Sequence, residues 1–364
     1  MTRRSALIAG ASVAGSLALG GTARAATTHN LSLRQQAGQR VVFSYPGATP
    51  PASLLDLIRA GEVGGVIFFG ENITSLSQIA DVVAQLKDAH AASPVNAPLL
   101  LMTDQEGGIV RRLPGEPVLS EKQVGASADP VAAASDAGTG AAENIAGVGM
   151  NTNLAPVLDV FRQAGNFDDR FGRSYSMDPN VCAECGVANV VAQQRLDVAA
   201  TAKHFPGLGA ATRDQNTDLT TVTLDVPLDE LRSVDELPFR AAIAAGVWMV
   251  MTSWAVYPAL DADLPAGLSP TIVQGELRRR LGFRGVTITD ALEAGSLAAF
   301  GTSAERGVRA AEAGMDVLLC SARDVSQGQT TVMALAEAVE HHDVDRGQFE
   351  SALRRVLRLR NRLH

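Results

Sequence analysis

Two adjacent donor side chains, Lys203 and His204, end a short apolar run and are followed at once by Phe205-Pro206-Gly207. The proline and the glycine prevent the chain from continuing as a helix or a central strand, so both donors are held beside a turn. An ammonium and an imidazole can together donate charge-assisted hydrogen bonds to a polar ligand. We therefore expect this segment to bind hydroxyl groups.

Two carboxylates also follow apolar runs, Asp104 after residues 99–103 and Asp290 after residues 285–289. A carboxylate at the end of a buried strand can accept hydrogen bonds from two hydroxyl groups or act as a nucleophile. Each also has a structural alternative, because aspartate is common in turns and at helix N-termini. If Asp290 only caps a helix before Ala291, its replacement by alanine costs about 1 kcal/mol of stability and no activity.

The elements that position these side chains alternate between short apolar runs and amphipathic stretches, with no linker or change in composition between them. Strands are expected at 41–45, 65–69, 99–103, 152–156, 199–204, 249–253, 285–289 and 316–320. Helices are expected at 53–60, 76–91, 132–147, 179–196, 237–245, 270–281, 304–313 and 346–363. This alternation predicts one α/β domain, a (β/α)₈ barrel of the TIM type. Asp104, Lys203, His204, Ser253 and Asp290 then fall at the C-terminal ends of strands, where barrel enzymes carry their chemistry.

Four segments in the same order resemble the motifs of family 3 glycoside hydrolases, in particular the bacterial β-N-acetylglucosaminidases. They are residues 101–108, 166–176, 202–207 and 286–292, and the resemblance extends from about Leu33 to the C-terminus. It implies a (β/α)₈ catalytic domain over residues 26–364 and terminal β-linked N-acetylglucosamine as the substrate. It further implies hydrolysis with retention of configuration and no metal or organic cofactor.

The resemblance also implies roles for individual side chains. Asp290 matches the aspartate that forms the covalent glycosyl-enzyme, as retaining hydrolysis requires. Five side chains match sugar-binding positions: Asp104, Arg112, Arg173, Lys203 and His204. Ile109 stands where the family usually has another arginine. Near Arg173, an ion pair between Asp169 and Arg170 could instead serve only to order the loop.

The sequence departs from the family at the acid/base unit. Where the family has Asp-Ser-His, this chain has Asp214, Gln215 and Asn216, and an asparagine cannot exchange a proton near neutral pH. Asp214 or Asp218 could supply the proton if burial raises its pKa. Two alternatives therefore stay open beside the hydrolase: a sugar-binding pseudoenzyme, and a phosphorylase or transglycosylase of the same family.

The N-terminus carries an export signal in its sequence. Arg3 and Arg4 precede a charge-free stretch, and Ala23-Arg24-Ala25 forms a cleavage site, so residues 1–25 are expected to be a signal peptide of the twin-arginine type. Its removal takes three arginines and no acid, which changes the net charge from −8 to −11. We expect a secreted monomer that acts on carbohydrate such as cell-wall fragments. Nucleic acid is excluded as a partner by the acidic charge, and no later apolar run is long enough for a membrane span.

Three cysteines, Cys182, Cys185 and Cys320, are an odd number for an exported chain. No second pair or histidine cluster accompanies Cys182 and Cys185, so zinc binding is not expected. Buried thiols or one local disulfide are predicted instead.

Overall fold

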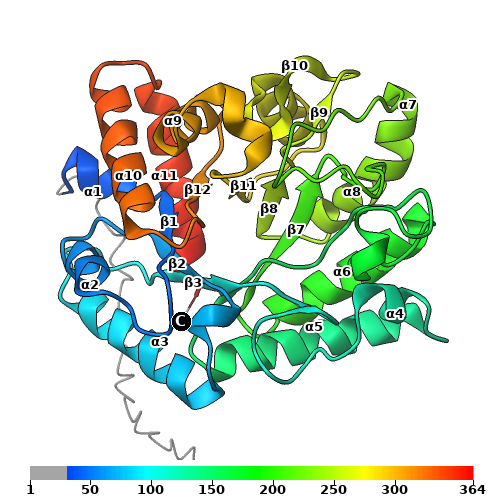
Figure 1. The fold of residues 1–364 in the computed structure, drawn as a ribbon, viewed down its shortest axis with the longest axis horizontal. Coiled ribbons are helices and arrows are strands. Elements are labelled where there is room, and N and C mark those ends of the chain that lie inside the picture. The colour runs from blue at the N-terminus through cyan, green and yellow to red at the C-terminus, as the bar shows by residue number, and fades with distance from the viewer. Residues whose placement is uncertain (1–30, 364) are drawn as a thin grey trace, which may run out of the picture.

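Eight short parallel strands close into a barrel in the computed structural model of this chain, which describes residues 31–363 (Figure 1). The strands are β1 (Val41–Phe43), β2 (Gly65–Phe68), β3 (Leu100–Thr103), β6 (Thr152–Asn153), β7 (Ala199–Phe205), β8 (Met249–Thr252), β11 (Val286–Ala291) and β12 (Val317–Leu319), and β12 pairs back onto β1. The predicted barrel is confirmed, with a strand inside or overlapping each expected range. The predicted signal peptide lies outside the described residues.

Helices surround the barrel between successive strands. They are α1 (Leu33–Gly38), α2 (Ala52–Arg59), α3 (Leu76–Ala91), α4 (Glu121–Gly125), α5 (Pro130–Gly147), α6 (Pro179–Gln194), α7 (Leu228–Glu230), α8 (Glu236–Ala244), α9 (Ser303–Ala313), α10 (Val325–Glu340) and α11 (Arg346–Arg360). Short 3₁₀ turns are η2 (Gly70–Asn72), η3 (Asp169–Phe171), η5 (Ala266–Leu268) and η7 (Gly295–Phe300), and π-helical segments are η4 (Leu231–Asp235) and η6 (Thr271–Arg280). The expected helix at 270–281 is η6, whereas α10 is a helix that the sequence pattern did not single out.

The interior of the barrel is filled by every second residue of its strands. On β3, Leu100 and Met102 belong to the interior cluster while Leu101 packs against the surrounding helices. On β11, Val286 and Ile288 are likewise interior. Because side chains alternate along a strand, the next inward positions after these are 104 and 290. The same alternation that fills the core therefore turns two aspartates toward the barrel axis.

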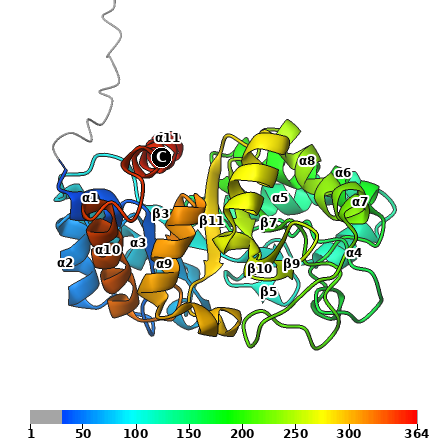
Figure 2. The same ribbon diagram turned by 90° about the horizontal axis from the view of Figure 1, so that it is seen from above.

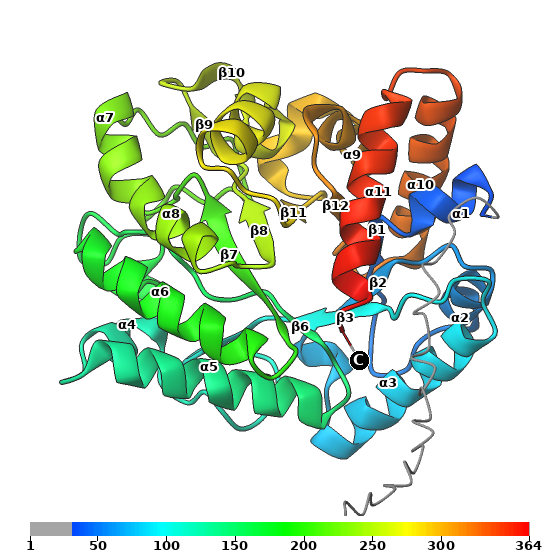
Figure 3. The same ribbon diagram turned by 180° about the vertical axis from the view of Figure 1, so that it is seen from behind.

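The two ends of the barrel are built differently. The C-terminal helix α11 lies across one end, where its apolar side chains Val356 and Leu359 join the interior cluster (Figure 3). Two small hairpins lie at the other end, away from α11 (Figure 2). They are β4 (Gln105–Gly107) with β5 (Val110–Arg111), and β9 (Val256–Tyr257) with β10 (Asp261–Pro265). One end is thus closed by a helix, and the other is left to loops.

The first hairpin depends on its glycine pair. Gly107 and Gly108 have φ of 113° and 55°, which other residues rarely adopt. A Cβ on Gly107 would lie 2.1 Å from the carbonyl oxygen of Leu119. The chain can therefore reverse directly after β3, which keeps Asp104 and its neighbours close to the barrel mouth.

All three cysteines are buried as free thiols. Burial raises the pKa of Cys182, Cys185 and Cys320 to about 12 each, so these thiols stay protonated. The prediction of buried thiols is confirmed. Over residues 31–363, none of the helices combines the length and the apolar character that crossing a bilayer requires.

Candidate active site

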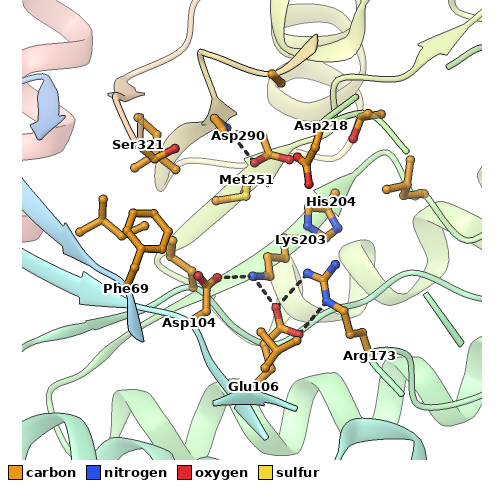
Figure 4. Close-up of a pocket in the computed structure, with 18 of the residues that line it drawn as sticks. Phe69, Asp104, Glu106, Arg173, Lys203, His204, Asp218, Met251, Asp290 and Ser321 are labelled. Atoms are coloured by element: carbon orange, nitrogen blue, oxygen red, sulfur yellow. Dashed lines mark hydrogen bonds and ion pairs between the residues drawn. The ribbon is translucent and has the colours of Figure 1, made fainter. Parts of the chain in front are cut away.

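A cavity of about 590 Å³ opens at the loop end of the barrel (Figure 4). Seven predicted site residues line it: Asp104, Arg112, Arg173, Lys203, His204, Asn216 and Asp290. Asp214 does not line the cavity and is exposed, so the structure does not bring it together with the others. Ser253 is also outside the cavity, where its hydroxyl accepts hydrogen bonds from the Ala255 N–H and the Tyr257 hydroxyl.

Five charged side chains form a continuous network on one wall of the cavity, and Figure 4 shows the contacts among Asp104, Lys203, Glu106 and Arg173. The Lys203 ammonium lies 2.9 Å from Asp104 Oδ1 and 2.7 Å from Glu106 Oε1. Arg173 donates two hydrogen bonds of 2.9 Å to the Glu106 carboxylate, one to each oxygen. Arg112 approaches the other Asp104 oxygen at 3.9 Å. These ion pairs fix the orientation of the charged side chains before a ligand binds.

The network holds Glu106 and Lys203 in their charged forms. Burial opposes ionisation of Glu106, but Arg173 and Lys203 outweigh it and lower the pKa of that carboxyl to about 2. Burial likewise opposes the charge of Lys203, and Asp104 with Glu106 reverses the effect and raises its pKa. The wall therefore presents a fixed ammonium, guanidinium and carboxylate, which suit the donors and acceptors of sugar hydroxyls.

A buried carboxylate, Asp159, fixes His204. The ring Nδ1 lies 2.7 Å from Asp159 Oδ2, and Asp159 Oδ1 accepts hydrogen bonds from the backbone N–H groups of His204 at 3.2 Å and Leu208 at 2.6 Å. Burial lowers the pKa of His204, but Asp159 outweighs burial and raises it. The ring thus donates through Nδ1 to Asp159 and leaves Nε2 for the cavity.

Asp168 is a second buried carboxylate behind the same wall. Neither of its oxygens has a hydrogen-bond partner in the described chain, and the nearest cation, Arg173, is 4.0 Å away. Burial and the charge of Asp159 raise the pKa of Asp168 to about 7, although Arg173 and His204 act in the opposite direction. A carboxyl that resists ionisation in this way destabilises the fold at neutral pH.

The loop that carries Arg173 is not ordered by the pair considered from sequence. Asp169 makes its ion pair with Lys122, at 2.6 Å, and not with Arg170. The Arg170 guanidinium instead stacks on Phe167 and Phe171, with centroid distances of 5.4 Å and 4.5 Å.

Asp290 lies near the end of strand β11, is half-buried and lines the cavity. The next helical turn, η7, begins only at Gly295, so Asp290 does not cap a helix. Its Oδ1 accepts a hydrogen bond of 2.7 Å from the N–H of Ala291. The Ala291 carbonyl in turn accepts from Trp254 Nε1 at 2.8 Å, which anchors the end of the strand.

Comparison with known proteins identifies the family. Residues 33–359 match the family described as glycosyl hydrolase family 3 N terminal domain. The chain belongs to glycosyl hydrolase family 3. Over 335 residues it is 48% identical to a protein of Arthroderma benhamiae named as an uncharacterized secreted glycosyl hydrolase, covering 92% of this chain and 94% of the relative.

Two solved structures have the same fold. A β-N-acetylglucosaminidase from Paenibacillus sp. superposes with a TM-score of 0.86 at 35% identity, over 91% of this chain and 62% of the other. A β-N-acetylhexosaminidase from Beutenbergia cavernae superposes with a TM-score of 0.82 at 35% identity, over 91% of this chain and 99% of the other. This chain thus spans less than two thirds of the Paenibacillus protein but nearly all of the Beutenbergia one.

Sequence reasoning missed two members of this family 3 site, Glu106 and Asp159. Glu106 directly follows Gln105 in the hairpin after Asp104, and only the pairing of β4 with β5 turns it toward Lys203 and Arg173. Asp159 stands in the apolar run Leu154–Val160, and a lone acid in a buried run was the available signal.

Proposed function

We propose that this family 3 chain is a retaining glycoside hydrolase that removes terminal β-linked N-acetylglucosamine, with Asp290 as its nucleophile. One observation carries the proposal: Asp290 faces the same cavity as the fixed donors Lys203, His204 and Arg173. A retaining hydrolase requires this combination, because the sugar must be held while a carboxylate attacks its anomeric carbon.

The charged wall supplies the sugar-binding groups. Asp104 accepts hydrogen bonds from sugar hydroxyls, and Lys203 and His204 donate to their oxygens. Arg173 and Glu106 hold Lys203 in place through the ion pairs described above. Since these groups are already ordered, little conformational entropy is lost when the sugar binds.

In the first half of the reaction, an Asp290 oxygen forms a bond to the anomeric carbon as the bond to the leaving oxygen breaks. The electron pair of the broken bond passes to the leaving oxygen, which requires a proton unless the leaving group is activated. Water then attacks the same carbon and releases the Asp290 carboxylate, so the configuration is retained.

The substrate is inferred from relatives. The solved structures named above are titled as a β-N-acetylglucosaminidase and a β-N-acetylhexosaminidase, which favours an N-acetyl amino sugar at the cleaved position. Export is supported by the name of the Arthroderma relative as secreted and by the sequence of residues 1–25. We further propose that the chain acts as a monomer on cell-wall fragments or amino-sugar oligosaccharides.

The test is release of the aryl alcohol from an activated aryl N-acetyl-β-glucosaminide. The wild-type chain should release it, Asp290→Asn should not, and Asp88→Asn on the exposed face of α3 should match the wild type. Sugar 1-phosphate as the product in phosphate buffer would identify a phosphorylase. Measurable sugar affinity without release would identify a sugar-binding pseudoenzyme.

A further inference from the structure

Asp218 brings a second carboxylate into the part of the cavity that Asp290 faces. It belongs to the turn at 216–220, in the connection that follows β7, whereas Asp290 belongs to β11. Both residues line the cavity, and Figure 4 shows their carboxylates directed into the same space beside His204. Within the described residues, Asp218 donates its backbone N–H to the Asn216 side chain. This bond leaves the Asp218 carboxyl available to a ligand.

The turn that carries Asp218 is held by hydrogen bonds at both sides. Asn216 Oδ1 accepts from the Asp218 N–H at 2.9 Å. The Asp218 carbonyl accepts from the Gly295 N–H at 2.8 Å, and the Thr217 carbonyl accepts from the Ser296 N–H at 3.1 Å. Since Gly295 and Ser296 lie in the connection that follows β11, that connection fixes the position of Asp218 relative to the strand that bears Asp290.

This attachment depends on the absence of a side chain at Gly295. A Cβ there would lie 2.3 Å from the Leu219 carbonyl oxygen and 3.0 Å from that of Asp218. The two backbones approach closely only because residue 295 is glycine. The turn is therefore built against the barrel mouth rather than extended into solvent.

The surroundings of Asp218 favour its protonated form. Although Asp218 is exposed, partial desolvation by the protein around it and the neighbouring charge of Asp290 raise the pKa of its carboxyl. The charged groups that act on Asp218 come from three parts of the chain: Asp290 on β11 with Glu293 just after it, His204 on β7, and Arg173 on the loop after β6. The negative charges of Asp290 and Glu293 raise the pKa of Asp218, and the positive charges of His204 and Arg173 lower it.

We propose that Asp218 donates the proton to the leaving group and later accepts a proton from water, a role that Asn216 cannot perform. The inference rests on the proposed hydrolysis through Asp290. Asp214 and Asp225 belong to the same connection but do not line the cavity, whereas Asp218 does. Asn216 is a positioning residue, because its side chain bonds the backbone of Asp218.

The protons balance over the two steps. As Asp290 bonds to the anomeric carbon, the leaving oxygen takes the Asp218 proton and departs as an alcohol. Asp218 is then a carboxylate, and it takes one proton from the attacking water while the water oxygen bonds to the anomeric carbon. The bond to Asp290 breaks, the electron pair returns to its carboxylate, and both aspartates regain their starting states.

The experiment compares two aryl N-acetyl-β-glucosaminides, phenyl with a poor leaving group and dinitrophenyl with a good one. Asp218→Asn should lower kcat/KM for the phenyl glycoside by roughly 10² to 10⁴, the usual contribution of general acid catalysis. For the dinitrophenyl glycoside the fall in kcat/KM should be less than about tenfold, because that leaving group needs no proton. Azide, which attacks without a base, should raise kcat of the variant and yield the β-glycosyl azide.

The pH profile gives a readout that a purely structural role would not change. In the wild type, kcat/KM for the phenyl glycoside should fall as the pH rises through the raised pKa of Asp218, and this alkaline fall should be absent in Asp218→Asn. The matched control is Asp225→Asn, an exposed carboxylate further along the same connection, which should behave as the wild type.

Each other outcome decides against the proposal in a distinguishable way. Equal losses on both glycosides, or no loss, with no effect of azide would overturn the role of Asp218 alone. A leaving-group-dependent loss in Asp214→Asn but not in Asp218→Asn would assign the role to Asp214. A wild-type chain that hydrolyses neither glycoside would overturn the proposed hydrolysis and, with it, this assignment.

Discussion

Replacing Glu106 by glutamine isolates the contribution of the buried charge network, because glutamine mimics the protonated carboxyl in size and shape. Glu106 is 4% exposed, so solvent screens its ion pairs little. Its pKa falls from 4.5 to about 2 because Arg173 and Lys203 outweigh the cost of burial. At about 1.4 kcal/mol per pKa unit, the charged form of Glu106 contributes about 3 kcal/mol to the free energy of unfolding at pH 7.

The sign of the pH dependence follows from the lowered pKa. A carboxyl whose pKa is lower in the folded state than in the unfolded state stabilises the fold at pH values above the unfolded-state pKa. This stabilisation is lost as the pH falls through the folded-state pKa. The difference in unfolding free energy between the wild type and Glu106→Gln should therefore shrink from about 3 kcal/mol at pH 7 to about 2 kcal/mol near pH 3.5. KM should also rise, since Lys203 loses one of its two carboxylate partners.

Urea unfolding followed by circular dichroism at both pH values measures this difference. Glu143→Gln, on the exposed face of α5, is the matched control and should leave the unfolding free energy unchanged. A loss below about 1 kcal/mol in Glu106→Gln at pH 7 would refute the reasoning. So would a loss that stays constant between the two pH values.

Three further predictions concern residues that support the cavity. Asp159→Asn should lower the pKa of His204, seen in an NMR titration of its ring, and raise KM near neutral pH; an unchanged titration contradicts this. Asp168→Asn should stabilise the chain in urea at pH 8 by about 4 kcal/mol and have little effect near pH 3.5, because only the ionised acid is costly when buried; destabilisation at pH 8 contradicts this. Gly295→Ala should displace the turn through the Leu219 carbonyl and reduce kcat on the phenyl glycoside about tenfold or more with little change in KM; unchanged kcat contradicts this.

The barrel and the inward aspartates could be predicted because they depend on regular periods. Apolar runs of strand length alternate with helical patterns, and a period of two along β3 and β11 directs positions 104 and 290 to the axis. Helix α10 was not predicted because Ser, Gln, Gly and Thr interrupt the apolar pattern of its first turns. Local sequence patterns therefore predict most of the architecture.

The contacts of the site were less accessible to sequence. Glu106 and Asp159 act through partners 67 and 45 residues away, which no local period reveals. In the irregular connection after β7, the resemblance matches Asp214 to the family's aspartate, whereas Asp218 lines the cavity in a turn that hydrogen bonds to Gly295 and Ser296. The signal peptide remains a prediction from sequence.

The most direct test of Asp290 as nucleophile is intact-protein mass spectrometry after exposure to a slow fluorosugar substrate, followed by peptide mapping. A mass gain of one sugar, located on the peptide and then the side chain of Asp290, is the expected result. No gain in a chain that hydrolyses aryl glycosides, or a gain on another residue, would contradict the central claim.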